Sequence, residues 1–228
     1  MSHSAHRFGT KEELRRDYVI FVRPAKGLDD VNEETRKETL RKTKELADIT
    51  LKYEPVNLGR TGAGCTAQGG DYDEIMNCRE FNGFMSVFTE KEKAKEVLKE
   101  FKEKDAGFSV VASGLTEDIF DICKEVGLRP HTILYSLGVW GKTELLPGKD
   151  HLKIITLCGH SMISPPMIDH YVEEIQKGEI TPEGAGKKLA KPCPCGIFNV
   201  PRTVEVLRTL AARGKKTLSG HLRMRRQP

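Results

Sequence analysis

The chain has 228 residues, of which 38% are hydrophobic and 31% charged, and a formal net charge of +4. This composition excludes an intrinsically disordered chain, and the length allows one large domain or two small ones. No apolar run approaches the roughly 20 residues that a membrane-spanning helix needs, and the first residues lack the apolar stretch of a secretory signal. We therefore expect a cytoplasmic protein with no membrane contact.

The first 150 residues have the pattern of an α/β domain. Short apolar runs rich in β-branched and aromatic residues predict strands, and apolar residues spaced by three and four predict helices. The expected strands are 17–22, 84–88, 108–112, 132–140 and 152–157, and the expected helices are 32–52, 89–106 and 116–126. Residues 84–112 form a β–α–β unit of the length that a crossover needs. Thr89 and Glu92 have the spacing of a capping box at the start of its helix.

Two stretches depart from this pattern. Residues 55–82 contain five glycines, Cys65 and Cys78, and are expected to form a long loop. Residues 214–228 form a basic segment, which we expect to be a flexible tail. The rest of the chain is net acidic, which argues against a nucleic-acid-binding domain.

The last third of the chain is expected to be helical. Three segments there have proline near their first position, at Pro165, Pro182 and Pro201, where the missing amide hydrogen is tolerated. The predicted fold is thus α/β, with a mixed sheet and βαβ units over residues 1–150. A small C-terminal helical segment follows at 151–213, and we expect it to carry the chemistry.

Two cysteine motifs precede predicted helices in this segment. One is Leu157-Cys158-Gly159-His160, and the other is Pro192-Cys193-Pro194-Cys195-Gly196. Helix N-termini stabilise thiolates, and glycine beside a sulfur lets backbone amides approach it, so Gly159 and Gly196 are candidate cofactor-binding positions. A reducing compartment favours metal ligation over disulfides for such cysteines. The sequence therefore predicts a metal centre held by Cys158, Cys193 and Cys195.

The expected cofactor is an oxygen-sensitive iron–sulfur cluster, with [4Fe–4S] favoured. Both ligand pairs are separated by only one residue, whereas structural zinc knuckles usually have two or more between paired ligands. The fourth ligand is left open among His160, Cys65, Cys78 and no protein group. His160 is also a tentative catalytic residue, as a general acid.

Several functions remain open from the sequence. A cluster with an exposed iron would suit an enzyme acting on an unknown small-molecule substrate. A fully ligated cluster would suit an electron-transfer or maturation protein with a redox partner. The alternatives are a zinc-stabilised interaction module, thiol redox chemistry between neighbouring cysteines, a metal-free binding platform, and simple packing of buried cysteines, which we expect for Cys123.

Overall fold

The computed structural model describes residues 6–25, 32–77 and 83–214. Its strands form one antiparallel sheet in the order β3-β2-β4-β1-β5. The strands are β1 (Tyr18–Pro24), β2 (Asn57–Arg60), β3 (Gly64–Cys65), β4 (Phe84–Phe88) and β5 (Phe108–Ser113). Short helices are α1 (Lys11–Leu14), η2 (Thr66–Gln68), α3 (Tyr72–Met76) and η3 (Thr143–Leu145). Longer helices are α2 (Glu33–Leu51), α4 (Lys91–Lys104), α5 (Thr116–Glu125), α6 (Lys149–Ile155), α7 (Pro165–Lys177), α8 (Pro182–Ala190) and α9 (Val200–Ala212).

The sheet has a split β–α–β topology. β4 and β5 both pair antiparallel with β1, so they run parallel to each other on either side of it. Helix α4 makes the crossover between them, and α2 connects β1 to β2 in the same way. The predicted crossover over residues 84–112 is therefore confirmed, with β1 inserted between its two strands.

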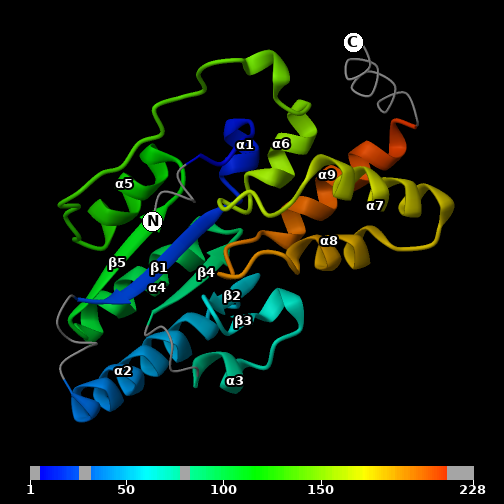
Figure 1. Ribbon diagram of the computed structural model, residues 1–228. Helices are drawn as coiled ribbons and strands as arrows, with labels where there is room; N and C mark the ends of the chain where they lie inside the picture. The colour runs from blue at the N-terminus through cyan, green and yellow to red at the C-terminus, as the bar shows by residue number, and fades with distance from the viewer. Residues whose placement is uncertain (1–5, 26–31, 78–82, 215–228) are drawn as a thin grey trace.

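Helices cover both faces of the sheet, because successive strand residues point to opposite sides. Tyr18 and Ile20 of β1 pack with buried residues of α2, α4 and α5. Val19 and Phe21 pack with residues of α6 to α9. Figure 1 shows these C-terminal helices grouped on one side of the sheet and α2 on the other. The C-terminal helices and the sheet thus share one hydrophobic core.

The predicted α/β class and the C-terminal helices are confirmed. Residues 17–22, 84–88 and 108–112 form strands, and 32–52 and 116–126 form helices, to within two residues at each end. The three proline-led helices appear as α7, α8 and α9, each with proline in its first turn. Every described helix is too short or too polar to cross a lipid bilayer.

Other local predictions are wrong. Residues 132–140 form no strand, and 152–157 lie in α6 and the turn after it. The expected loop at 55–82 contains β2, β3, η2 and α3, while Cys78 lies outside the described residues. Glu90, and not Thr89, is the N-cap of α4, and no capping box forms there. The tail from residue 215 onward also lies outside the described residues.

Candidate metal centre

Cys158 lies in a tight turn between α6 and α7. Its backbone amide donates to Ile155 O at 3.1 Å, and Ser161 N donates back to Cys158 O at 3.0 Å. Ser161 has a left-handed φ of 54°, which curls the chain round the buried sulfur. The backbone amides of His160 and Met162 then donate hydrogen bonds to that sulfur. The turn is thus shaped around a sulfur that accepts two amide hydrogen bonds.

Cys193 and Cys195 lie in the turn between α8 and α9, and both are fully buried. The amide of Cys195 donates to the sulfur of Cys193, and the amide of Ile197 donates to that of Cys195. Gln68 of η2 holds the turn from outside, because its Nε2 donates to Cys193 O at 3.2 Å. Residues 55–82, which the sequence predicted to be a long loop, therefore support this turn through η2.

Gly59 and Gly196 bring the cysteine turn directly onto the sheet. A Cβ atom placed on Gly59 would lie 2.9 Å from the Cα of Gly196, closer than real Cβ atoms approach a neighbour. Gly196 also has a φ of +78°, in the region that favours glycine. The backbone of β2 thus touches the backbone of the turn that carries Cys195. Gly159, the other glycine predicted at the site, precedes His160 in the first turn.

The two turns place four candidate ligands close together. Cys195 Sγ lies 3.9 Å from Cys193 Sγ and 3.9 Å from His160 Nδ1. Cys158 is near enough to Cys193 for a hydrogen bond between the two thiols. The three cysteines are buried, whereas His160 is exposed. The group therefore combines three buried thiols with one exposed histidine.

The three thiols influence one another's ionisation. The hydrogen bond with Cys193, followed by burial, raises the pKa of Cys158. Contact with Cys158 lowers the pKa of Cys193, but Cys195 and burial outweigh it and raise this pKa to about 12. The hydrogen bond from Cys193 lowers the pKa of Cys195, and the Ile197 amide acts in the same direction. Cys195 is thus the thiol that ionises first.

The two remaining described cysteines are Cys65, which lies beside the cysteine turn, and Cys123. A Cβ atom placed on Gly59 would lie 2.6 Å from the Cβ of Cys65 and 2.9 Å from the Cα of Gly196. Cys65 is buried in β3, where the amides of Ala67 and Gln68 and the side chain of Asn57 interact with its sulfur. None of the other three cysteines contributes to its pKa, which burial raises. Cys123 packs in α5 with 9% of its surface exposed, in agreement with the packing role expected for it.

A buried ionic network, which no pattern in the sequence indicated, adjoins the cysteine turn. Arg7 Nη1 and Arg202 Nη1 lie 3.2 Å and 2.8 Å from Asp17 Oδ2. Arg7 Nη2 also donates to Ile197 O at 2.6 Å, two residues after Cys195. Burial lowers the pKa of Arg7, while Asp17 and the nearby Cys193 and Cys195 act to raise it. Two arginines facing one aspartate leave positive charge beside the thiols.

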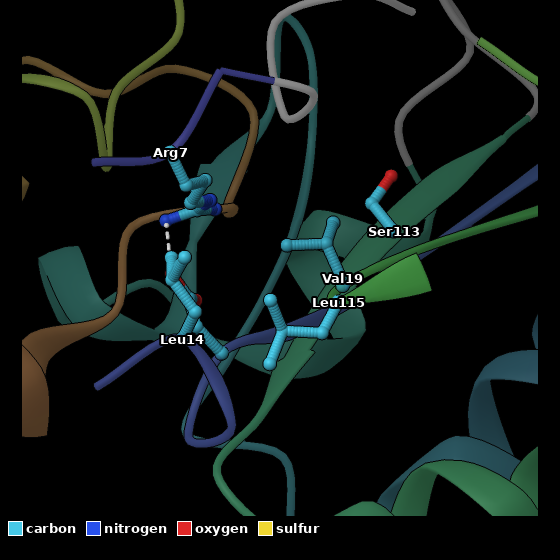
Figure 2. Close-up of a pocket in the computed structure, with 7 residues that line it drawn as sticks. Arg7, Leu14, Val19, Ser113 and Leu115 are labelled. Carbon is cyan, nitrogen blue, oxygen red and sulfur yellow. Dashed lines mark ion pairs between the residues drawn. The ribbon is translucent and has the colours of Figure 1, made fainter. Parts of the chain in front are cut away.

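Arg7 also lines a small cavity of about 60 Å³. Figure 2 shows its ion pair as a dashed line, with Val19, Ser113 and Leu115 across the cavity. Arg7 Nε and Nη1 are buried and have no hydrogen-bond partner there. A cavity of this size is large enough for water but not for a substrate of ordinary size. We assign it no binding role.

The structure and the comparisons with known proteins set limits on this site. Among the described residues, no group of three or more His, Cys, Asp or Glu side chains is placed so that it could hold a metal ion. Comparison of the chain with protein-family models, curated proteins and solved structures finds no match. The fold and the site define an α/β protein with a split β–α–β sheet and a buried group of three thiols.

Proposed function

We propose that this chain is a metal-centre protein, with Cys158, Cys193 and Cys195 as ligands and His160 as the fourth. The observation that carries the proposal is the position of Cys195 Sγ, 3.9 Å from both Cys193 Sγ and His160 Nδ1. Metal–sulfur bonds of about 2.3 Å in a tetrahedron give ligand separations of about 3.8 Å. The two separations of 3.9 Å are thus close to those expected between ligands of one metal ion.

Side-chain movement completes the site in this proposal, because no three of the groups meet the requirements of a metal site as they stand. Cys158 and His160 lie in one turn, two positions apart, so a rearrangement of that turn would move both ligands together. Amide hydrogen bonds to all three sulfurs support the proposal, because such bonds stabilise thiolates. A metal ion would then displace the thiol protons.

A single zinc ion is the form that this spacing supports best. It would join the turn before α7 to the turn before α9 and so hold the helical layer together, which is the zinc-stabilised module that the sequence left as its alternative. Structural zinc sites take four ligands of this kind, and removal of the ion destabilises the fold around them.

An iron–sulfur cluster is the second candidate. The one-residue spacing in Cys193-Pro194-Cys195 and the positive charge of Arg7 beside these thiols favour it, because thiolate-bound clusters carry negative charge. Each ligand of a [4Fe–4S] cluster binds its own iron, so Cys193 and Cys195 would have to move apart. In that form the exposed His160 marks the side from which a substrate or redox partner would approach.

Metal and sulfide analysis of protein purified without oxygen distinguishes the two forms. Zinc predicts a colourless protein with about one ion per chain, and a cluster predicts visible charge-transfer absorption with iron and sulfide in similar amounts. We expect Cys158→Ala and Cys193→Ala to lose the metal. Cys123→Ala is the matched control, since it replaces a buried cysteine in α5, outside the group, and it should keep the metal.

Three results would contradict the proposal. The wild-type protein could contain neither zinc nor iron after growth with both. The metal content could be unchanged in Cys158→Ala, or it could fall equally in Cys123→Ala. A metal-free protein that readily forms a disulfide between Cys193 and Cys195 would point instead to thiol redox chemistry.

A further inference from the structure

The segment of residues 132–140, called the arm here, is apolar and exposed. Its large apolar side chains are Ile133, Leu134, Tyr135, Leu137, Val139 and Trp140, which are 50%, 60%, 59%, 87%, 63% and 82% exposed. At roughly 200 Å² for a large side chain, this amounts to about 800 Å² of exposed surface. Single exposed apolar residues are common, but a contiguous group of this size marks an interaction surface.

The backbone of the arm has no partner strand. Its hydrogen bonds in the described chain are local, such as Gly138 N to Ser136 Oγ at 3.3 Å and Trp140 Nε1 to Leu137 O at 2.6 Å. The sequence nevertheless has the β-branched and aromatic composition that predicts a strand. The arm thus combines a strand-forming sequence with unpaired backbone groups.

The same chain exposes an edge strand to which such a segment could pair. β5 lies at the end of the sheet, and the strand that pairs with it among the described residues is β1. Ser109 and Val110 of β5 are exposed, and neither β5 nor the arm contains a charged residue. Proteins usually protect a free edge with charges, proline or a covering element, because an open edge recruits another strand. An uncharged extended segment is the partner that strand addition requires.

The arm does not reach this edge in its own chain. In Figure 1 the segment between α5 and α6 arches away from the sheet before it returns at α6. Each chain therefore offers one arm and one edge strand that is exposed at Ser109 and Val110. In two copies related by a twofold axis, the arm of each chain could pair with the edge strand β5 of the other chain.

We propose that the arm adds to β5 of a second copy of this chain and forms a symmetric, arm-exchanged dimer. The area agrees with this occupant, because a stable interface buries about 800 Å² per partner and the arm alone exposes about that much. The absence of charge from both elements favours a contact made by backbone hydrogen bonds and apolar side chains. Residues of the metal centre take no part in it.

The dimer is tested by light scattering and sedimentation of the full chain at about 1–100 μM. We expect a wild-type dimer. The arm variant Leu137→Ser/Trp140→Ser should weaken its dissociation constant about thirtyfold or more, because large anchors dominate interfaces. Val110→Lys should weaken it similarly by placing a charge on the edge strand. Leu145→Ser, which replaces a leucine outside the arm that is 72% exposed, should leave it unchanged. Circular dichroism confirms that each variant folds.

Mixing the arm variant with the edge variant provides the specific test. The mixed dimer retains one intact arm–edge contact, whereas each variant alone retains none, so mixing should restore dimers. A monomeric wild-type protein at the highest concentration would overturn the proposal. So would a dimer insensitive to both variants, or a failure of the mixture to dimerise when the wild type does.

Discussion

Replacement of Asp17 by asparagine should destabilise the fold strongly. The Asp17 carboxylate is fully buried and forms ion pairs with the guanidinium groups of both Arg7 and Arg202. It also accepts a hydrogen bond from Asn199 Nδ2 at 3.1 Å. Asparagine keeps the size of the side chain but removes its charge, so the loss reports electrostatics and not a cavity. Arg7 then loses the carboxylate that neutralises it, and Arg202 keeps the attraction of Glu13.

The expected cost follows from these contacts. Removal of one partner from a buried ion pair costs about 3–5 kcal/mol in the free energy of unfolding. For a protein of this size, that lowers the melting temperature by about 6–20 °C. Glu205→Gln is the control, since Glu205 pairs with Arg16 at the surface, where both side chains are about half exposed. Exposed pairs of this kind contribute about 0–1 kcal/mol.

The assay is reversible urea unfolding of the wild type and both variants, with the midpoint and slope fitted together. Asp17→Asn should lower the midpoint with little change in slope, and Glu205→Gln should hardly move it. Addition of Arg7→Met to Asp17→Asn should recover part of the loss, because one uncompensated buried charge is removed. A loss below about 1 kcal/mol for Asp17→Asn would refute the electrostatic reasoning.

Two further predictions concern backbone contact and ionisation. Gly196→Ala should destabilise the protein by about 1–3 kcal/mol more than Gly178→Ala in urea unfolding. Both glycines have φ near +78°, but only Gly196 touches Gly59. Equal losses of stability in the two variants would contradict this reasoning. Burial and a 2.8 Å hydrogen bond to Asp118 raise the pKa of Tyr18 above its ordinary value of 10.0. Tyr18→Phe should therefore lower the free energy of unfolding by about 1–2 kcal/mol at neutral pH. The difference between wild type and variant should shrink as the pH rises above 10.0, where the unfolded tyrosine loses its proton. A difference that stays constant with pH until the protein unfolds would contradict this prediction.

Periodicity predicted the elements that present one apolar face to the core. Residues 84–88 and the helix after them have an unambiguous pattern, because Ala94, Val97, Leu98 and Phe101 fall on one side of α4 and are all buried. Residues 152–157 were misassigned because a short apolar run fits a strand and a buried helix equally well. Residues 152–155 of that run are helical in α6, where Ile154 is fully buried, and Leu157 is buried in the turn that follows.

Long-range contacts were not accessible from local patterns. β2 was missed because Asn57-Leu58-Gly59-Arg60 contains no β-branched residue. Its glycine is required by the approach of Gly196, more than a hundred positions away. Asp17 and Arg202 are likewise separated by 185 positions. Their charges looked like ordinary surface residues, and only the fold reveals that they are buried together.

The cysteine motifs were visible because their sequence is unusual locally. Cys193-Pro194-Cys195 has no helix or strand periodicity, so packing alone explained it poorly. The sequence could not show how far apart the sulfurs lie, and that distance now bears on the choice between one ion and a cluster. The same reasoning separates the metal centre from the arm. The thiols lie between the sheet and α6–α9, whereas the arm and β5 need no metal to pair. If Cys158→Ala loses the metal but keeps the dimer, then the metal centre and the arm-exchanged dimer are independent of each other.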